Sequence, residues 1–357
     1  MREEPSRGPR LSVIVPATDR PATIRRSTEA IEAELDDGDE LIVVTEPDGD
    51  GPAAARNTGA AIASGEVIVF VDADVVVHRG GLGRIRSAFA GDDSLVALFG
   101  SYDDSPEAPG AVSGFRNLLH HHVHQSAAGP AATFWAGLGA MRRDAFVGAG
   151  GFDAERFPAP SVEDIELGIR LARGGERVVL DRALQGTHLK AWTLAEMVHT
   201  DLVRRGIPWI GILLQPGAPR GALNLGWRHR LSAAATLLAV GAIAARRPRP
   251  AAIAALCLIA LNRSLYALVW RRRGAGEAFA SVGLHAIHHL TGIVAVLAGV
   301  LLYLWNRHVS CEPASLSPTR KASGDASSRI AQGHIAQNHI GVDSRPSAGK
   351  FSSPAEP

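Results

Sequence analysis

Two aspartates, Asp72 and Asp74, lie one residue apart in the otherwise apolar run FVDADVVV that begins at Phe70. A buried charge without a partner is costly, so such groups are normally protonated, paired or bound to a metal. If the strand ends at Asp72, both carboxylates lie on the bend that follows it. Their oxygens suit a hard divalent cation. We therefore expect a metal and ligand site here, although an ordinary turn explains the pair equally well in isolation.

A second pair of acids, Glu163 and Asp164, lies at the start of a segment with helical spacing, residues 162–173. The helix dipole stabilises acids in a first turn, and this explanation suffices when the pair is considered alone. A carboxylate that reaches a bound hydroxyl group can instead act as a general base. His188 follows the last predicted strand, where an imidazole could ligate a metal or contact a phosphate, and we include it as a candidate metal ligand.

The predicted elements that position these residues alternate between strands and helices. Apolar runs bounded by turn-forming residues predict strands at residues 11–16, 40–45, 66–72, 95–101, 132–142 and 176–180. Helical spacing predicts helices at residues 21–35, 53–63 and 162–173. We expect glycines to break the 132–142 strand, a tight turn at 146–152, and 176–180 at the edge of the sheet. The alternation predicts a doubly wound, mainly parallel sheet.

Acidic or turn-forming residues follow the first three predicted strands. They are Pro16 and Ala17, Glu46 and Asp48, and Asp72 and Asp74. In doubly wound sheets the ligand binds beyond the carboxyl ends of the strands. We therefore expect these residues to meet at one edge of the sheet.

Four segments, in this order, resemble glycosyltransferase family 2. They read LSVIVP from Leu11, GPAAARNTGAAIASGEVIVFVDADV from Gly51, WAGLGAMRRDAFVGAGGFD from Trp135 and VEDIELGIRLARGG from Val162. The resemblance covers residues 10–215. It implies a GT-A, Rossmann-like α/β fold with a mixed, mainly parallel sheet and flanking helices. It also implies transfer of a sugar from a nucleotide-diphosphate sugar.

The resemblance further implies roles for single residues. Asp74 would coordinate a divalent metal, Mg²⁺ or Mn²⁺, that bridges the donor diphosphate, and Asp72 would contact the nucleoside. Asp164, with Glu163 beside it, would be the general base that deprotonates the acceptor. The nucleotide pocket would be lined by Arg56 and Asn57, and the base would meet the backbone of Pro16 and Ala17. In isolation, Arg56 is explained equally well as a solvated helix residue.

The chain departs from the family pattern at the end of the second strand. The family usually has two aspartates and a Gly-Ser there, whereas this chain reads Thr45-Glu46-Pro47-Asp48. Glu46 is the aligned acid and Asp48 its rival for the nucleoside. The departure affects the identity of the base and sugar more than the type of reaction.

Two groups of histidines allow a metal interpretation. Four histidines fall within His120–His124, but they cannot all face one ion from a helix, so we expect a solvated or headgroup-facing segment. His285, His288 and His289 share one face of an apolar helix. A haem or metal site is one alternative there, and helix packing or an interfacial role is the favoured one.

The last third of the chain is strongly apolar. Residues 231–245, 251–270 and 282–305 form three apolar runs, of which only the last two reach the ~20 residues that a membrane span needs. Before them, tryptophans beside arginines suit a membrane surface. Basic clusters flank the middle run on both sides, and Asn262-Arg263-Ser264 interrupts it. Either this run is re-entrant, or one basic cluster lies outside. A soluble helical domain with a buried core is the alternative.

These patterns divide the chain into five expected segments. They are an N-terminal tail at 1–9, a glycosyltransferase domain at 10–205, an interfacial linker at 206–230, two or three C-terminal membrane helices at 231–306, and a disordered tail at 307–357. No apolar leader precedes the first strand, so we expect the catalytic domain to face the cytoplasm from the cytoplasmic membrane. The net charge of +1 gives no reason to expect nucleic acid as a partner.

The sequence as a whole predicts a membrane-anchored, inverting glycosyltransferase. Its partners would be a nucleotide-sugar donor and a lipid-linked or membrane-proximal acceptor, and its product a cell-envelope glycan. A single transfer is favoured because the Gln/Arg-x-x-Arg-Trp motif of processive enzymes is absent; Asp201 to Trp209 stand there, with Arg204 and Arg205 facing an acceptor phosphate or lipid headgroups. A nucleotidyltransferase is disfavoured, since no glycine-rich loop follows the first strand. A catalytically inactive membrane scaffold is the alternative function.

Overall fold

A computed structural model describes residues 8–47, 51–215 and 226–310, and the fold in this section refers to them. The predicted tails at 1–9 and 307–357 lie mostly outside these residues, and so does Asp48. Met1–Cys311 forms one compact unit.

The first half of the chain forms the parallel part of the sheet. Its strands are β1 (Leu11–Pro16), β2 (Glu40–Val44) and β3 (Val67–Val71). β1 lies in the middle and pairs in parallel with both neighbours. The connecting helices are α1 (Ile24–Glu32) and α2 (Pro52–Ile62). All three carboxyl ends therefore lie at the same edge, as the sequence predicts.

The second half of the sheet mixes directions. β7 (Leu138–Arg142) runs antiparallel between β3 and β5 (Leu95–Tyr102), while β8 (Arg177–His188) runs parallel to β5. Two short strands, β4 (Val75–Val77) and β6 (Gly129–Ala131), pair antiparallel with β8. The sheet is thus mixed, as predicted. The prediction of an edge strand at 176–180 is wrong, because β8 lies between β5 and β4.

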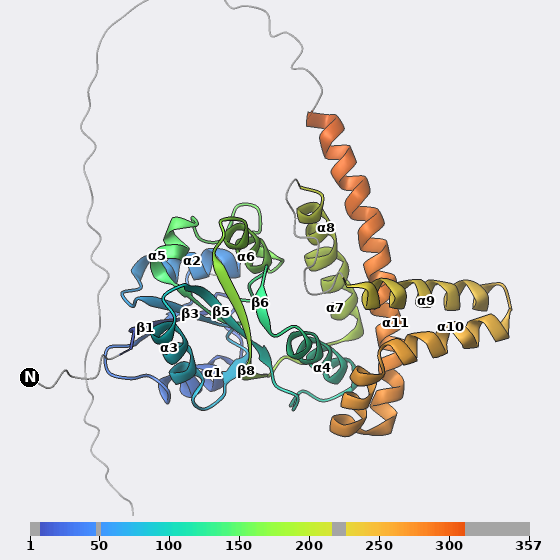
Figure 1. The fold of residues 1–357 in the computed structure, drawn as a ribbon, viewed down its shortest axis with the longest axis horizontal. Helices are drawn as coiled ribbons and strands as arrows, with labels where there is room; N and C mark the ends of the chain where they lie inside the picture. Colours follow the sequence, from blue (N-terminus) through green and yellow to red (C-terminus); the bar gives the residue numbers. More distant parts are fainter. Residues whose placement is uncertain (1–7, 48–50, 216–225, 311–357) are drawn as a thin grey trace, which may run out of the picture. The chain divides into compact units, whose positions relative to one another are not determined.

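Helices cover both faces of the sheet (Figure 1). α2, α5 (Arg143–Gly148) and α6 (Glu163–Arg173) pack on one face, and α1 and α3 (Gly81–Gly91) on the other. Alternation along β1 divides the core accordingly, since Ile14 faces the first set of helices while its neighbours face the second. Two local predictions are wrong: the strand predicted at 132–142 begins only at Leu138, and residues 146–152 include the end of α5.

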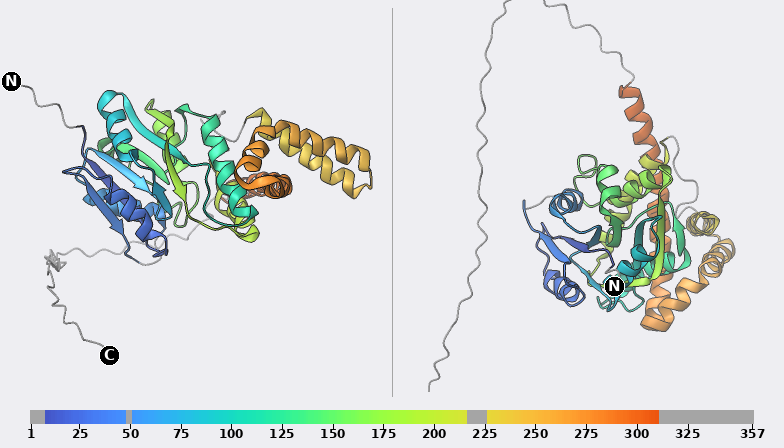
Figure 2. Two further views of the ribbon diagram at one scale, coloured as in Figure 1. Left: turned by 90° about the horizontal axis from the view of Figure 1, so that it is seen from below. Right: turned by 60° about the vertical axis from the view of Figure 1, so that its left-hand side comes forward.

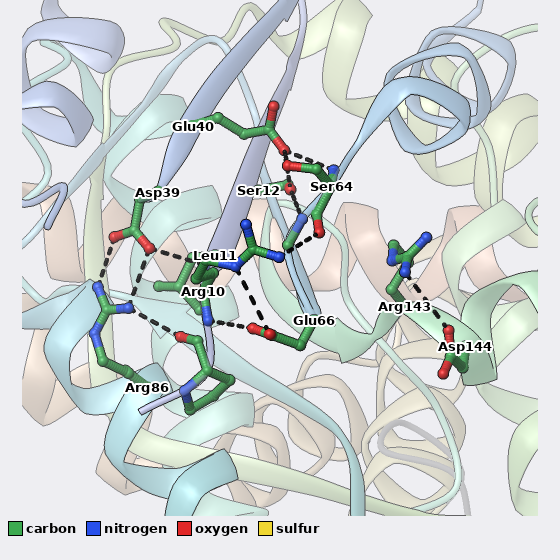
Figure 3. A network of polar contacts seen from close by, with 12 residues as sticks. Arg10, Leu11, Ser12, Asp39, Glu40, Ser64, Glu66, Arg86, Arg143 and Asp144 are labelled. Carbon is green, nitrogen blue, oxygen red and sulfur yellow. Dashed lines mark hydrogen bonds and ion pairs between the residues drawn. The ribbon is translucent and has the colours of Figure 1, made fainter. Parts of the chain in front are cut away.

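The amino edge of the sheet is closed by paired polar side chains (Figure 3). Asp39 accepts hydrogen bonds from Arg86, with Nη2 to Oδ2 at 2.6 Å. Glu40 accepts from the hydroxyl groups of Ser12 and Ser64, at 2.6 and 2.8 Å. These hydrogen bonds hold the amino ends of β1 and β2 together and occupy both acids. The candidate site lies at the opposite, carboxyl edge of the sheet.

Helices from distant parts of the chain pack together beside the sheet. A buried apolar cluster joins α4 (Ala111–Ser126), α7 (Leu194–His199) and α11 (Arg263–Ser310), with Phe115, Met197 and Val269 among its members. A π-helical segment, η1 (Thr200–Gly206), connects α7 to α8 (Ile207–Leu213). α11 is interrupted at Gly274, where φ is 87°.

One described segment, Arg263–Arg307 in α11, is long and apolar enough to cross a membrane, by length and composition only. The predicted run at 231–245 falls in α9 (Trp227–Ala244), which lies beside α10 (Pro248–Leu261) as a hairpin (Figure 2). The predicted run at 251–270 is divided between two helices at the expected interruption, because α10 ends at Leu261 and a new helix begins at Arg263. The last predicted run, 282–305, lies within α11.

Candidate active site

Asp72 and Asp74 lie on a tight bend between β3 and β4. β3 ends at Val71, so both follow the strand, as predicted. The amide nitrogen of Val75 donates to the carbonyl oxygen of Asp72 at 2.9 Å, and the amide nitrogen of Leu189 to that of Asp74 at 2.9 Å. The carboxylates keep 30% and 26% of their surface exposed. The bend therefore presents both acids to a ligand at the carboxyl edge.

Arg56 joins the first aspartate to the second acidic pair. Its Nη2 donates to Oδ1 of Asp72 at 2.7 Å and its Nη1 to Oε1 of Glu163 at 3.1 Å. The Arg56 side chain is 5% exposed, so the alternative of a solvated helix residue is wrong. Burial raises the pKa of Asp72, against the charge of Arg56. One guanidinium thus fixes two acids from different elements.

His188 is held against Asp74 by three neighbours. Its Nε2 lies 3.4 Å from Oδ2 of Asp74, and its Nδ1 lies 2.6 Å from Oδ1 of Asn117. Its ring stacks on Tyr102 at 4.2 Å between centroids and 7° between planes. Burial raises the pKa of Asp74, but the hydrogen bond and charge of His188 outweigh it, so this pKa lies below its usual value.

The donor set at this point fits a divalent cation. With Oδ1 of Asn117 as acceptor, His188 carries a proton at Nδ1, so its Nε2 is the ring atom that faces the Asp74 carboxylate. A cation that replaces the Nε2 proton would be held between this nitrogen and the carboxylate. Carboxylate oxygens suit Mg²⁺ or Mn²⁺, and an added imidazole nitrogen favours the transition metal Mn²⁺. Among the described residues no group of three or more such side chains is arranged to hold an ion, so the remaining ligands would come from substrate and water.

Asp164 lies across the site, in the first turn of α6. Its Oδ2 accepts a hydrogen bond from the amide nitrogen of Ala136 at 3.2 Å. Burial and the neighbouring charge of Glu163 raise the pKa of Asp164 to about 6. The next residue after Ala136, Gly137, accepts a hydrogen bond from the amide of Asp72 at 3.1 Å. Two adjacent residues therefore bring the acid pair and Asp164 into one neighbourhood.

The other candidate donor-binding residues have partners of their own. The amide of Ala17, directly after Pro16, donates to the carbonyl oxygen of Val44 at 2.8 Å and so joins the ends of β1 and β2. Glu46 pairs with Arg20 at 2.5 Å, on the surface. Their contacts with a donor stay predictions.

Asn57 uses both of its polar groups on one backbone residue. Its Nδ2 donates to the carbonyl oxygen of Phe152 at 2.8 Å, and its Oδ1 accepts from the Phe152 amide at 2.9 Å. Gly151, beside it, has a φ of 68°, which favours glycine. Asn57 therefore positions the Gly-Gly-Phe-Asp segment, and its predicted contact with the nucleotide stays untested.

The histidine tract does not form a solvated segment, contrary to the prediction. His124 is 6% exposed and its Nδ1 contacts the carbonyl oxygen of Gly100 at 2.9 Å. His120 stacks on His124 at 3.9 Å, whereas His122 points to Arg228 of α9. Burial lowers the pKa of His120 well below its usual value. The tract packs α4 between the sheet and the C-terminal helices, and its members face different neighbours.

Several residues at the site lie outside the sequence motifs, and most of them were not predicted. Tyr102 and Asn117 hold His188, and burial raises the pKa of Tyr102, aided by the charges of Asp74 and Asp72. Lys190 adds positive charge beside Asp74, and Arg205 adds it beside Asp164. The sequence could have indicated Lys190, because it lies two residues after the candidate ligand His188. It does not indicate Tyr102 or Asn117, because these residues reach His188 only through the pairing of β5 with β8 and the packing of α4.

Part of the chain matches a known protein family. Residues 25–147 match the model of glycosyl transferase family 2, a segment that contains Arg56, Asn57, Asp72 and Asp74. No curated protein matches the chain.

Solved structures that resemble the chain include two glycosyltransferases. The mannosyltransferase PcManGT from Pyrobaculum calidifontis, solved with GDP-Man and Mn²⁺, is 18% identical over 85% of this chain and 89% of its own, with a TM-score of 0.46. GalNAc-T7, solved with UDP, GalNAc and Mn²⁺, is 13% identical over 61% of this chain and 53% of its own, with a TM-score of 0.41.

Proposed function

Because residues 25–147 belong to glycosyl transferase family 2, we propose that the chain is an inverting, hexosyltransferase-type glycosyltransferase. It takes a sugar from a nucleotide-diphosphate donor and gives it to a lipid-linked or membrane-proximal acceptor. The observation that carries the proposal is the gathering of Asp72, Asp74 and Asp164 at the carboxyl edge of the sheet, linked by Ala136 and Gly137.

Donor binding uses the rim of the first three strands. Asp72, fixed at Oδ1 by Arg56, keeps an exposed carboxylate oxygen for the nucleoside. Pro16, Ala17 and Glu46 line the ends of β1 and β2, where a base would lie. Asp48 is the rival of Glu46 but lies outside the described residues.

Asp74 and His188 are the residues that would hold a divalent cation, Mg²⁺ or Mn²⁺. When bound, the cation supplies positive charge to the departing diphosphate. Asn117 and Tyr102 orient the imidazole through the 2.6 Å contact and the stacked ring. Lys190 adds a further positive charge on the same side.

Asp164 acts as the general base. Its carboxylate takes the proton from the acceptor hydroxyl as that oxygen forms a bond to the anomeric carbon. The bond from this carbon to the diphosphate oxygen breaks, and its electron pair leaves with the nucleoside diphosphate. One displacement inverts the anomeric centre. Glu163 stays engaged with Arg56 and acts as a positioning residue for Asp72 and Asp164.

The C-terminal helices anchor the enzyme to the cytoplasmic membrane with the catalytic domain facing the cytoplasm, where nucleotide-sugars would be available for cell-envelope glycans. The apolar Arg263–Arg307 segment supports anchoring. Exposed aromatic side chains at Trp227, Trp270 and Trp305 suit the interface and lipid. We retain the division into residues 10–205, 206–230 and 231–306 as part of the proposal.

A nucleotide panel with Mn²⁺ tests the proposal against an inactive scaffold. The full-length chain in detergent should bind one nucleoside diphosphate in a metal-dependent way and hydrolyse or transfer its sugar. Asp74→Ala and Asp164→Ala should remove turnover while the thermal unfolding transition stays cooperative. A wild-type chain that binds no nucleotide, or full activity in either variant, would overturn the proposal.

A further inference from the structure

Two consecutive arginines, Arg204 and Arg205, lie at the end of η1, and Arg205 is the more exposed of the two. Neither guanidinium has a hydrogen bond or ion pair among the described residues. The carbonyl oxygen of Arg204 accepts a hydrogen bond from the hydroxyl of Ser161 at 2.6 Å. A cation left open beside a candidate active site is available to a ligand.

The hydrogen bond from Ser161 fixes η1 against the start of α6. The amide of Ser161 also donates to Oε2 of Glu163 at 2.9 Å, next to the candidate base. Gly206 lies so close to α11 that an added Cβ would stand 2.5 Å from that of Ala295. Arg205, between Arg204 and Gly206, therefore lies between the start of α6 and the apolar helix α11.

Asp201, one turn earlier in η1, is fully used by other residues. Its Oδ1 accepts from Arg116 at 2.7 Å, and its Oδ2 lies 2.7 Å from Nδ1 of His288. Asp201 therefore has its hydrogen bonds with residues other than Arg205, although the positive charge of Arg205 also acts on it. Arg116 forms a buried ion pair with Asp201.

The positive charges of the site are divided between its two sides. Lys190 acts on Asp74, on the donor side. Arg205 acts on Asp164, lowering its pKa against burial, and on Tyr102. The principal charges around Asp72 and Asp74 do not include Arg205. Arg205 thus lies near the candidate base Asp164, and its charge also acts on Asp201 in η1.

We propose that Arg205 binds a phosphate-class anion that the acceptor carries close to the hydroxyl deprotonated by Asp164. This inference rests on the proposed function. A guanidinium matches phosphate oxygens with paired donors, and it stays charged at any physiological pH. The anion belongs either to a lipid headgroup or to a soluble phosphate ester, and both present the same chemistry to Arg205.

Titration of the full-length chain in detergent with inorganic phosphate, followed by calorimetry, tests the soluble source. Arg205→Ala should bind phosphate at least about tenfold more weakly than wild type, the loss of one charge-assisted contact. Arg204→Ala is the matched control and should bind as wild type does. Arg205→Lys should bind phosphate with an affinity between those of the two alanine variants, since lysine keeps the charge but lacks the paired donors of a guanidinium.

Flotation with phosphatidylcholine vesicles, with and without phosphatidic acid, tests the lipid source. Wild type and Arg204→Ala should gain binding from phosphatidic acid, and Arg205→Ala should lose that gain. Dependence on Arg205 in the phosphate titration alone assigns a soluble ester, and dependence with vesicles assigns a headgroup. Equal behaviour of the two alanine variants in both assays overturns the inference.

Nucleotide binding by the same variants separates this inference from the proposed function. Arg205→Ala should bind the nucleotide with wild-type affinity, because Arg205 is not among the principal charges around Asp72 and Asp74. Normal nucleotide binding with unchanged anion binding would refute the role of Arg205 alone. A wild-type chain that binds no nucleotide would refute the transferase itself.

Discussion

Asp72 and Glu163 are separated by 91 positions in the sequence, yet both bind the same guanidinium, that of Arg56, at 2.7 and 3.1 Å. The donor-side acid and the helix that carries the candidate base are therefore one electrostatic unit. Removing the positive charge would leave two acids in a poorly hydrated place, where an unpaired charge is costly.

Arg56→Ala should destabilise the fold by about 3–5 kcal/mol, the usual cost of leaving a buried charge without its partner. Arg56→Lys should keep the fold but weaken nucleotide binding by about tenfold or more, because one ammonium cannot form the same fork to both acids. Thermal unfolding and calorimetric nucleotide titration measure the two effects. Arg25→Ala, at an exposed pair with Glu29, should change neither. Wild-type affinity in Arg56→Lys would show that Asp72 does not need its fixed orientation.

Asp164→Asn should separate stability from activity. Because burial raises the pKa of Asp164 to about 6, its ionised form opposes folding, and this cost grows as pH rises from about 4 through 6. Asparagine removes the charge, so the unfolding temperature at pH 7 should stay equal or rise. Turnover should fall by about 10²–10⁴-fold with the loss of the base. A variant that is both active and less stable would contradict the assignment.

The pH profile of the wild type should follow the same group. The base must be ionised, so kcat/KM should fall about tenfold per pH unit below roughly 6 and stay level above it. The measurement is the initial rate at acceptor concentrations well below KM and at fixed metal, with circular dichroism at each pH to show that the fold persists. A profile that is flat to pH 5 would exclude Asp164 as the base.

His188→Ala should raise the Mn²⁺ concentration needed for half-saturation by about tenfold or more, since it removes a nitrogen ligand beside Asp74. Direct Mn²⁺ binding, followed by electron paramagnetic resonance, measures this without turnover. His199→Ala, at an exposed position of α7, is the matched control. If Asn117→Ala has a smaller effect in the same direction, the 2.6 Å contact orients the ring as inferred. Equal Mn²⁺ affinity in His188→Ala and wild type would remove this ligand from the proposal.

The sequence predicts those parts of the fold that depend on the order of apolar and turn-forming residues within one segment. The strands around Leu11–Pro16 and Val67–Val71 lie where apolar runs end in turn-forming residues, and their parallel pairing follows from the helices between them. The same reasoning ended the strand at Asp72, one residue beyond its end at Val71 in the structure. β8 was misjudged because its length to His188 and its two neighbours depend on pairings with distant strands.

The candidate site was predictable where acids follow strand ends, and unpredictable where partners are distant in sequence. Nothing near Arg56 indicates that it pairs with Glu163, 107 positions away. Tyr102 and Asn117 reach His188 only through β5 and α4. In the C-terminal third, the sequence predicted apolar helices and an interruption at Asn262. It did not indicate that the Asn262 amide donates to the Ser232 hydroxyl of α9 at 2.8 Å.

Asp201→Asn should loosen the contact between the catalytic domain and α11. The carboxylate joins Arg116 of α4 to His288 of α11, and the side chains of both Arg116 and Asp201 are less than a tenth exposed. Asparagine leaves the guanidinium without its counter-charge, which costs about 3–5 kcal/mol in a buried pair. The unfolding temperature in detergent should therefore fall well below that of wild type, whereas Glu29→Gln, at the exposed pair with Arg25, should not change it. An unchanged unfolding temperature in Asp201→Asn would mean that α11 is held by its apolar contacts alone.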